Sequence, residues 1–135
     1  MNVGKYIYAK LTATAGVTAL VSTRVYPVIL PQNATFPAIV YTVSTAPNDS
    51  QKTQAANHDK EVVTFRFWAD AQYGADAYTS VMAIDSAVRA AIDFVSGTAG
   101  SVQVDHCHFD RSEDIISDER LLIGRESVYT FIVKR

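Results

Sequence analysis

The sequence has little of what several common functions require. It has one cysteine among 135 residues, so no disulfide can form within the chain and the fold depends on its packed core. Basic side chains are not in excess either, because 12 lysines and arginines stand against 14 aspartates and glutamates. A chain with a net charge of -2 lacks the basic surface that holds nucleic acid by counterion release. We therefore expect at most a passing contact with DNA.

Long apolar runs are also missing. No segment reaches the roughly 20 apolar residues of a membrane-spanning helix, and the opening residues, MNVGKYIYAK, contain no apolar signal segment. We expect a soluble protein that is made in the cytoplasm and has no membrane contact. The chain does have a hydrophobic content of 48%, enough for one core, and no repeat or linker divides it. The sequence predicts a single domain over residues 1–135.

The order of hydrophobic patterns predicts an α+β domain. The fourfold spacing of Val3, Ile7 and Leu11 predicts a first helix that reaches Val21 with an interruption at Gly16. Threefold and fourfold spacing predicts a second helix over about 71–94. Between and after them, β-branched and aromatic residues predict a short strand with an irregular arm within 22–37, then strands at 38–45, 59–69, 102–109 and 125–135. The order α-β-β-β-α-β-β favours a largely antiparallel (mixed) sheet with two α-helices packed on one face.

Two polar segments connect these strands. Residues 46–58, APNDSQKTQAANH, contain no apolar side chain larger than alanine and predict a mobile loop. Residues 110–120 predict a charged connection, in which Glu113 with Asp114 and Asp118 with Glu119 offer pairs of carboxylates. Such pairs serve as general acid and base or as calcium ligands. Without the ordered ligand spacing of a calcium loop, solvated charge is the better interpretation.

Apolar residues occur on both faces of the predicted strands. If Val63, Phe65 and Tyr129 face the helices, the opposite face carries the apolar side chains of Val40, Val62, Trp68, Val128 and Ile132. Two helices cover only one face, so we predict that the second face is a subunit interface; the alternative is that twist and loops cover it within the monomer. Residues 1–60 hold five basic and two acidic side chains, and residues 61–135 hold seven and twelve. This asymmetry is compatible with a heterologous contact that closes into a ring.

The stretch VDHCHFD, residues 104–110, is the one candidate for a metal site. In an extended strand His106, His108 and Asp110 lie on one face, where they could supply three zinc ligands and leave the fourth position open. Cys107 points to the other face, so the strand is equally explained by a small apolar residue inside and histidines in water. We favour the ordinary strand. With no Gly-x-Ser-x-Gly elbow and no phosphate-binding glycine loop, the sequence predicts neither enzyme activity nor a cofactor.

Three segments, in this order, resemble the tail completion proteins of long-tailed phages. VTALVSTRVYPVILPQNATFPAIVYTVS resembles the part of that family with a first helix, an Arg-hydrophobic-Tyr-Pro strand, a proline-bounded arm and a Pro-x-hydrophobic-hydrophobic-Tyr strand. VVTFRFWADAQYGADAYTSVMAIDSAV is similar to the strand and long helix that follow, and ISDERLLIGRESVYTFIV to the closing segment. The resemblance covers nearly the whole chain.

The resemblance implies a virion assembly protein, also called a tail terminator or tail-to-head joining protein. Relatives in phages, prophages and gene transfer agents cap the growing tail tube, often as a six-membered ring, and present a surface to the head connector. The expected partners are further copies of the chain, the tail tube protein and the head connector, with DNA only passing through the ring. The expected location is the virion neck, after assembly in the host cytoplasm. We expect the loop to order on contact with a neighbour or the tube, through Asn48, Asp49, Gln51, Lys52 and His58.

Other functions stay open at this point. Another neck or tail-tube protein of the same architecture shares most of these features. A metal-binding or enzymatic module would have to use His106, His108 and Asp110, and a small-ligand-binding domain would need a pocket that nothing in the sequence marks.

Overall fold

The computed structural model describes residues 3–48, 58–117 and 121–134. Helical segments within these ranges are α1 (Gly4–Thr12), α2 (Ala15–Val21), the 3₁₀ turn η1 (Ala71–Tyr73) and α3 (Ala75–Ile92). The strands are β1 (Val25–Pro27), β2 (Ala38–Asn48), β3 (His58–Asp70), β4 (Gly97–Ala99), β5 (Val102–Ser117) and β6 (Leu122–Lys134).

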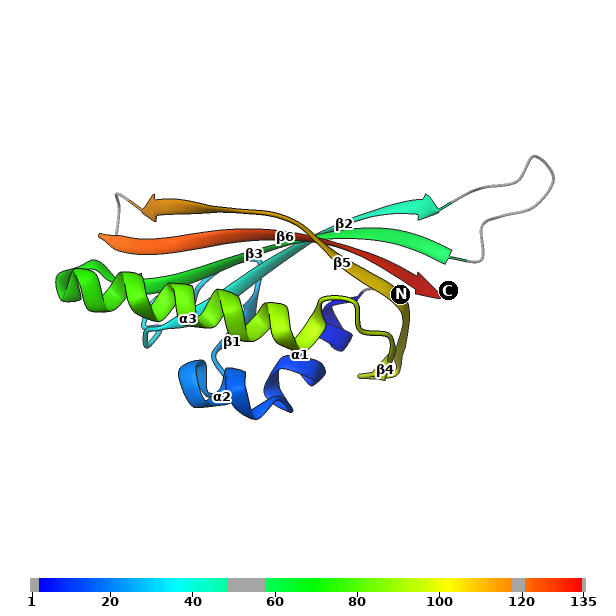
Figure 1. Ribbon diagram of the computed structural model, residues 1–135, viewed down its shortest axis with the longest axis horizontal. Helices are drawn as coiled ribbons and strands as arrows, with labels where there is room; N and C mark the ends of the chain where they lie inside the picture. The colour runs from blue at the N-terminus through cyan, green and yellow to red at the C-terminus, as the bar shows by residue number, and fades with distance from the viewer. Residues whose placement is uncertain (1–2, 49–57, 118–120, 135) are drawn as a thin grey trace.

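The six strands of the described residues form one sheet in the order β1-β2-β3-β6-β5-β4. Strand β1 is parallel to β2, and every other neighbouring pair is antiparallel. Figure 1 shows α1, α2 and α3 together on one side of the sheet, while no helix of the described part lies on the other side. The predicted α+β class, the mixed and largely antiparallel sheet and the helices on one face are confirmed.

The first helical region differs from the prediction, because it is two helices rather than one. The break falls at Ala13 and Thr14, not at Gly16, which lies inside α2. The hydroxyls of Thr12 and Thr14 donate to the carbonyls of Tyr8 and Lys10 at 2.6 and 2.7 Å. Thr14 then has extended dihedrals, with φ -97° and ψ 114°. Threonine hydroxyls compete for helix carbonyls in this way and favour helix boundaries over interiors.

The long helix is also shorter than the predicted 71–94. Its start is set by Gly74, whose φ of +54° separates α3 from the η1 turn. The predicted apolar stripe is confirmed, since Ala77, Val81, Ile84 and Val88 are buried on α3. The order α-β-β-β-α-β-β therefore needs two corrections, the division of the first helix and the added strand β4, which pairs with the start of β5.

The core lies between this stripe and the facing side of the sheet. Val63, Phe65 and Phe67 alternate along β3 and are fully buried, as their spacing predicts. The ring of Phe65 stacks on Phe67 at 6.1 Å and meets Tyr129 of β6 edge to face at 5.5 Å. Aromatic packing of this kind fixes the centre of β3 against β6.

Both predicted connections are shorter than expected. Strand β5 continues to Ser117 and pairs with β6 from Leu122, so most of the predicted charged connection is strand. Its charges pair across and along strands, as Arg111 does with Glu113 at 2.7 Å, which lets a charged segment stay extended. The predicted loop at 46–58 is strand at both ends, because β2 reaches Asn48 and β3 begins at His58. Residues 49–57, 118–120 and 135 lie outside the described residues.

Candidate assembly surface

The face of the sheet opposite the helices is the candidate functional surface. The alternation of buried core residues along β2, β3 and β6 places on this uncovered face all five residues predicted for the subunit interface: Val40, Val62, Trp68, Val128 and Ile132. Val40 and Val128 are only 5% and 9% exposed, so the monomer itself covers them. Val62, Trp68 and Ile132 are half-buried and leave apolar surface open to a partner.

Trp68 lies flat on this face over the adjacent strand β6. A Cβ atom placed on Gly124 would come within 2.6 Å of Cε3 of Trp68 and 3.0 Å of Ile115 on β5. The glycine therefore makes room for the indole ring of Trp68. Trp68, Gly124 and Ile115 form a flat apolar platform.

A hollow of about 500 Å³ lies beside this platform. Val40, Trp68 and Leu122 of the sheet line it together with Val28 and Ile29, which follow β1. Val28 and Ile29 are 71% and 75% exposed, and the Val28 backbone is held to β2 by a 2.8 Å hydrogen bond from its N–H to the carbonyl of Tyr41. We did not predict the arm as part of this surface. The signal was available in the run Val-Ile-Leu between Pro27 and Pro31, too short for a core strand and too apolar for an ordinary loop.

Charged residues cross the same face between three strands. Arg66 of β3 pairs with Glu126 of β6 at 3.1 Å, and Arg111 of β5 reaches the other oxygen of Glu126 at 3.3 Å. Each arginine is well exposed, so these pairs add little stability. They link β3, β6 and β5 across this face and leave guanidinium groups at the surface.

The predicted metal candidates also lie on β5. The rings of His106 and His108 are 5.2 Å apart, and Nε2 of His108 lies 3.1 Å from the carboxylate of Asp110, which accepts a hydrogen bond from the Thr130 hydroxyl at 2.6 Å. Among the described residues no group of three or more His, Cys, Asp or Glu side chains is placed to hold a metal ion. Cys107 points into the core, as its alternation predicts, and burial raises the pKa of its thiol to about 12. It is therefore a neutral thiol near pH 7, unsuited to nucleophilic attack.

Two of the five residues predicted for partner contact, Asn48 and His58, lie at one end of the sheet. Asn48 ends β2 opposite His58, the first residue of β3, and the His58 ring contacts the carboxylate of Asp105. Asp49, Gln51 and Lys52 fall outside the described residues. The structure thus brings Asn48 and His58 together at the base of the β2–β3 connection.

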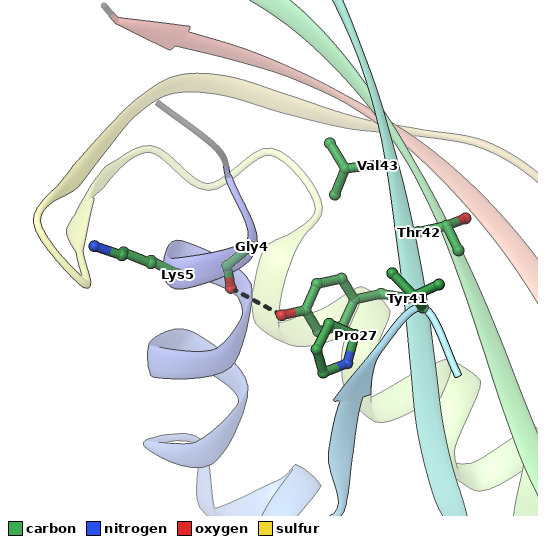
Figure 2. Close-up of a pocket in the computed structure, with 7 residues that line it drawn as sticks. Gly4, Lys5, Pro27, Tyr41, Thr42 and Val43 are labelled. Carbon is green, nitrogen blue, oxygen red and sulfur yellow. Dashed lines mark hydrogen bonds between the residues drawn. The ribbon is translucent and has the colours of Figure 1, made fainter. Parts of the chain in front are cut away.

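A second hollow, of about 520 Å³, lies where β1 ends beside β2. Figure 2 shows it between the start of α1 and the edge of β2, with Lys5, Pro27 and Val43 around it. The Tyr41 hydroxyl donates to the carbonyl of Gly4 at 3.4 Å and closes its floor. Nearby, the buried carboxylate of Glu61 accepts hydrogen bonds from the Val3 N–H and the Thr45 hydroxyl, both at 2.9 Å. Burial raises the pKa of Glu61, although these two bonds act in the opposite direction.

A small α+β domain with an uncovered, partly apolar sheet face has a surface suited to contact with other molecules. The sequence profile of the family described as tail completion protein gp17 matches residues 5–134. The chain therefore belongs to this family, and the resemblance found in its sequence is confirmed. Its role is that of a structural protein of phage-type tails.

Comparison with solved structures agrees with this assignment. A chain in the structure titled "Virion of native gene transfer agent (GTA) particle" shares the fold with a TM-score of 0.76 at 21% sequence identity. The match covers 96% of this chain and 92% of that chain. No curated protein matches the sequence. No helix in the described ranges is both long enough and apolar enough to cross a bilayer.

Proposed function

We propose that this protein caps the tail tube as an oligomeric ring, stops tube polymerisation and joins the tail to the head connector. The observation that carries the proposal is the family match over residues 5–134. The shared fold with a chain of a gene transfer agent particle supports it. On this proposal the protein resides in the neck of the virion, after assembly in the host cytoplasm, and DNA only passes through the ring.

Capping requires a subunit with two different ends. Figure 1 shows that β2 ends and β3 begins at one end of the sheet, whereas β5 ends and β6 begins at the other. A ring of such subunits has two unlike rims, one of which binds the last tube layer while the other does not repeat the contacts of a tube subunit. Termination needs this combination of an attractive surface and a non-permissive one.

We assign the uncovered face to contacts between subunits. Val62, Trp68 and Ile132 keep apolar surface exposed, and the platform of Trp68 and Ile115 beside the arm offers a flat apolar contact. At the opposite end from the β5–β6 connection, Asn48 and His58 flank the segment that contains Asp49, Gln51 and Lys52. We assign these five polar residues to contact with the tube or a neighbouring subunit, with an ordering cost offset by the contacts made.

The mass of the purified protein, measured by light scattering over a range of concentrations, tests the ring directly. Rings of about six subunits in negative-stain images of the same fractions would support it, as the resemblance implies and closed symmetry allows. If the protein is monomeric, purified tail tubes are added and their ends are imaged. Tubes that stop growing and carry a terminal density support capping, whereas a protein that elongates into tubes by itself is a tube protein of the same architecture.

A further inference from the structure

Strand β2 has an open outer edge along half of its length. Its neighbour β1 pairs with it only from Ile39 to Tyr41, although β2 continues to Asn48. The Ile39 N–H donates to the Arg24 carbonyl and the Tyr41 carbonyl accepts from the Val28 N–H. The backbone N–H and C=O groups of every second residue of β2 therefore point toward this edge. The next two are Val43 and Thr45. Within the described residues no strand pairs with β2 at these positions.

Strand β5 has an open edge on the opposite side of the sheet. Its first half is covered, because β4 pairs with residues 102–104, the Phe94 N–H donates to the Cys107 carbonyl at 2.9 Å and Asp93 accepts from the Phe109 N–H at 3.0 Å. After the irregularity at Phe109, the backbone N–H and C=O groups of β5 alternate between its two edges. Counted through the registers of the sheet, this alternation directs the backbone groups of Glu113 toward β6. The residues that point to the open edge are therefore Ser112, Asp114 and Ile116.

The two open edges are compatible in direction and position. Within one chain β5 runs antiparallel to β2, and copies related by rotation about a ring axis keep that relation. The open half of β2 lies at one end of the sheet and the open half of β5 at the other, as Figure 1 shows. Because the two open halves lie at opposite ends, pairing the β2 edge with the β5 edge shifts each subunit relative to its neighbour along the strand direction. A constant stagger of this kind is what a closed, tilted sheet requires.

We propose that neighbouring subunits join by antiparallel strand pairing, in which the open edge of β2 in one copy binds the open edge of β5 in the next. Val43 then lies opposite Ile116, and Thr45 lies opposite Asp114. The partner is a second copy of this chain, and the inference rests on the proposed ring. It names which strands form the ring contact.

The hollow beside β2 selects this register. Ile116 is 70% exposed, and it alternates with Ser112 and Asp114, whose side chains contact Asp85 and Tyr78 of α3 on the helix-covered side. Opposite Val43, the Ile116 side chain of the neighbour enters the hollow of about 520 Å³ that Figure 2 shows on that same side of β2. Burying an exposed isoleucine there removes apolar surface from water in both subunits.

Charge favours the same pairing. Residues 110–117 of β5 hold three acidic side chains and one arginine, whereas residues 42–47 of β2 hold no charge. Lys5 lines the hollow, on the side toward which the neighbour's acidic strand would come. Opposite charges at a contact increase the specificity of the association more than its affinity.

Disulfide trapping tests the pairing. In this register Ala46 and Glu113 are opposite each other, exposed, and on the uncovered face. The double variant Ala46→Cys/Glu113→Cys is expected to give a ladder of linked subunits on mild oxidation, ending in a closed ring. The matched control Ala46→Cys/Asp114→Cys moves one thiol to the other face of β5 and is expected to give no ladder. The native Cys107 is fully buried and does not take part.

A proline substitution supplies an independent test. Val43→Pro removes an N–H that points to the open edge, where no strand of the described residues pairs with it, and that donates across the proposed junction. Pro47 already occupies an equivalent edge position in β2. Val43→Thr keeps the N–H and nearly the same shape. The proline variant should raise the concentration at which rings dissociate by roughly fivefold or more relative to the threonine variant.

The outcomes separate the two proposals. Rings that form without cross-links, and that tolerate Val43→Pro as well as Val43→Thr, would overturn the strand pairing and leave the ring standing. A protein that neither forms rings nor cross-links, alone or on tube ends, would overturn both. A ladder that also appears with the Asp114 control would show random collision and would refute the register.

Discussion

Tyr129 gives the sharpest prediction for stability. Its ring is fully buried on β6, at 5.5 Å from the ring of Phe65 and 5.4 Å from that of Phe109. Its hydroxyl has no hydrogen-bond partner among the described residues. Burial raises the pKa of Tyr129, and the charges of Asp85 and Asp93 act in the same direction, so the group stays a neutral phenol. The substitution Tyr129→Phe removes the oxygen and keeps the packing.

The expected gain follows from the cost of an unpaired buried hydroxyl. Such a group destabilises the folded state by about 1–3 kcal/mol relative to water, and the lower value applies where the site relaxes. We expect Tyr129→Phe to raise the free energy of unfolding by about 1 kcal/mol. This corresponds to about 0.5 M in the urea midpoint and about 3 °C in Tm. Trp68, the only tryptophan, reports unfolding by fluorescence.

The control is Tyr41→Phe, which removes a hydroxyl that does donate, to the Gly4 carbonyl at 3.4 Å. We expect this variant to be unchanged or slightly less stable. Both are measured at one protein concentration, because an assembling protein gains apparent stability with concentration. A loss of 1 kcal/mol or more in Tyr129→Phe, at an unchanged denaturant slope, would show that the hydroxyl is bonded and would refute the reasoning (about one lost hydrogen bond).

Three further predictions concern other sites. Burial raises the pKa of Glu61 in the folded protein, so the free energy of unfolding should fall as the pH rises from 4.5, the ordinary pKa of the group, through its raised folded pKa. Glu61→Gln can bond the same two groups and should remove this fall, as measured by urea titrations at several pH values. Gly124→Ala should displace the Trp68 ring, shifting its fluorescence and lowering stability by about 1–3 kcal/mol. Deleting residues 49–56 should leave the circular dichroism spectrum and Tm nearly intact yet abolish head joining in an assembly assay; loss of folding, or undiminished joining, would contradict it.

The sequence predicts the core well because alternation and helical periodicity are local signals. Val63, Phe65 and Phe67 on β3 and Val81, Ile84 and Val88 on α3 are all buried as predicted. The errors have a common cause in long-range pairing. Strand β5 extends through its charged half because Arg125 and Glu126 of β6 pair with Asp114 and Arg111 across the ladder, and such partners are invisible in a single segment.

The candidate surface was only partly predictable for a related reason. Alternation identified the uncovered side of Val62, Trp68 and Ile132, but it could not show that the fold already buries Val40 and Val128. It also missed the arm, because Val28 and Ile29 join the surface through a long-range backbone bond between Val28 and Tyr41. Whether a strand edge is open depends on the order of strands in the sheet, which no local pattern contains.

The two open edges differ in a way that disfavours like-with-like pairing. An antiparallel pair of two β5 edges would set acidic residues such as Asp114 against each other, which is destabilising. A pair of two β2 edges would meet Pro47, which has no N–H to donate. Either pairing would also give a closed two-fold dimer, which cannot grow into a ring. Pairing β2 with β5 avoids the clash of acidic residues and brings one Pro47 rather than two into each junction. It also leaves one open edge of each kind on every added subunit, so addition continues until the ring closes.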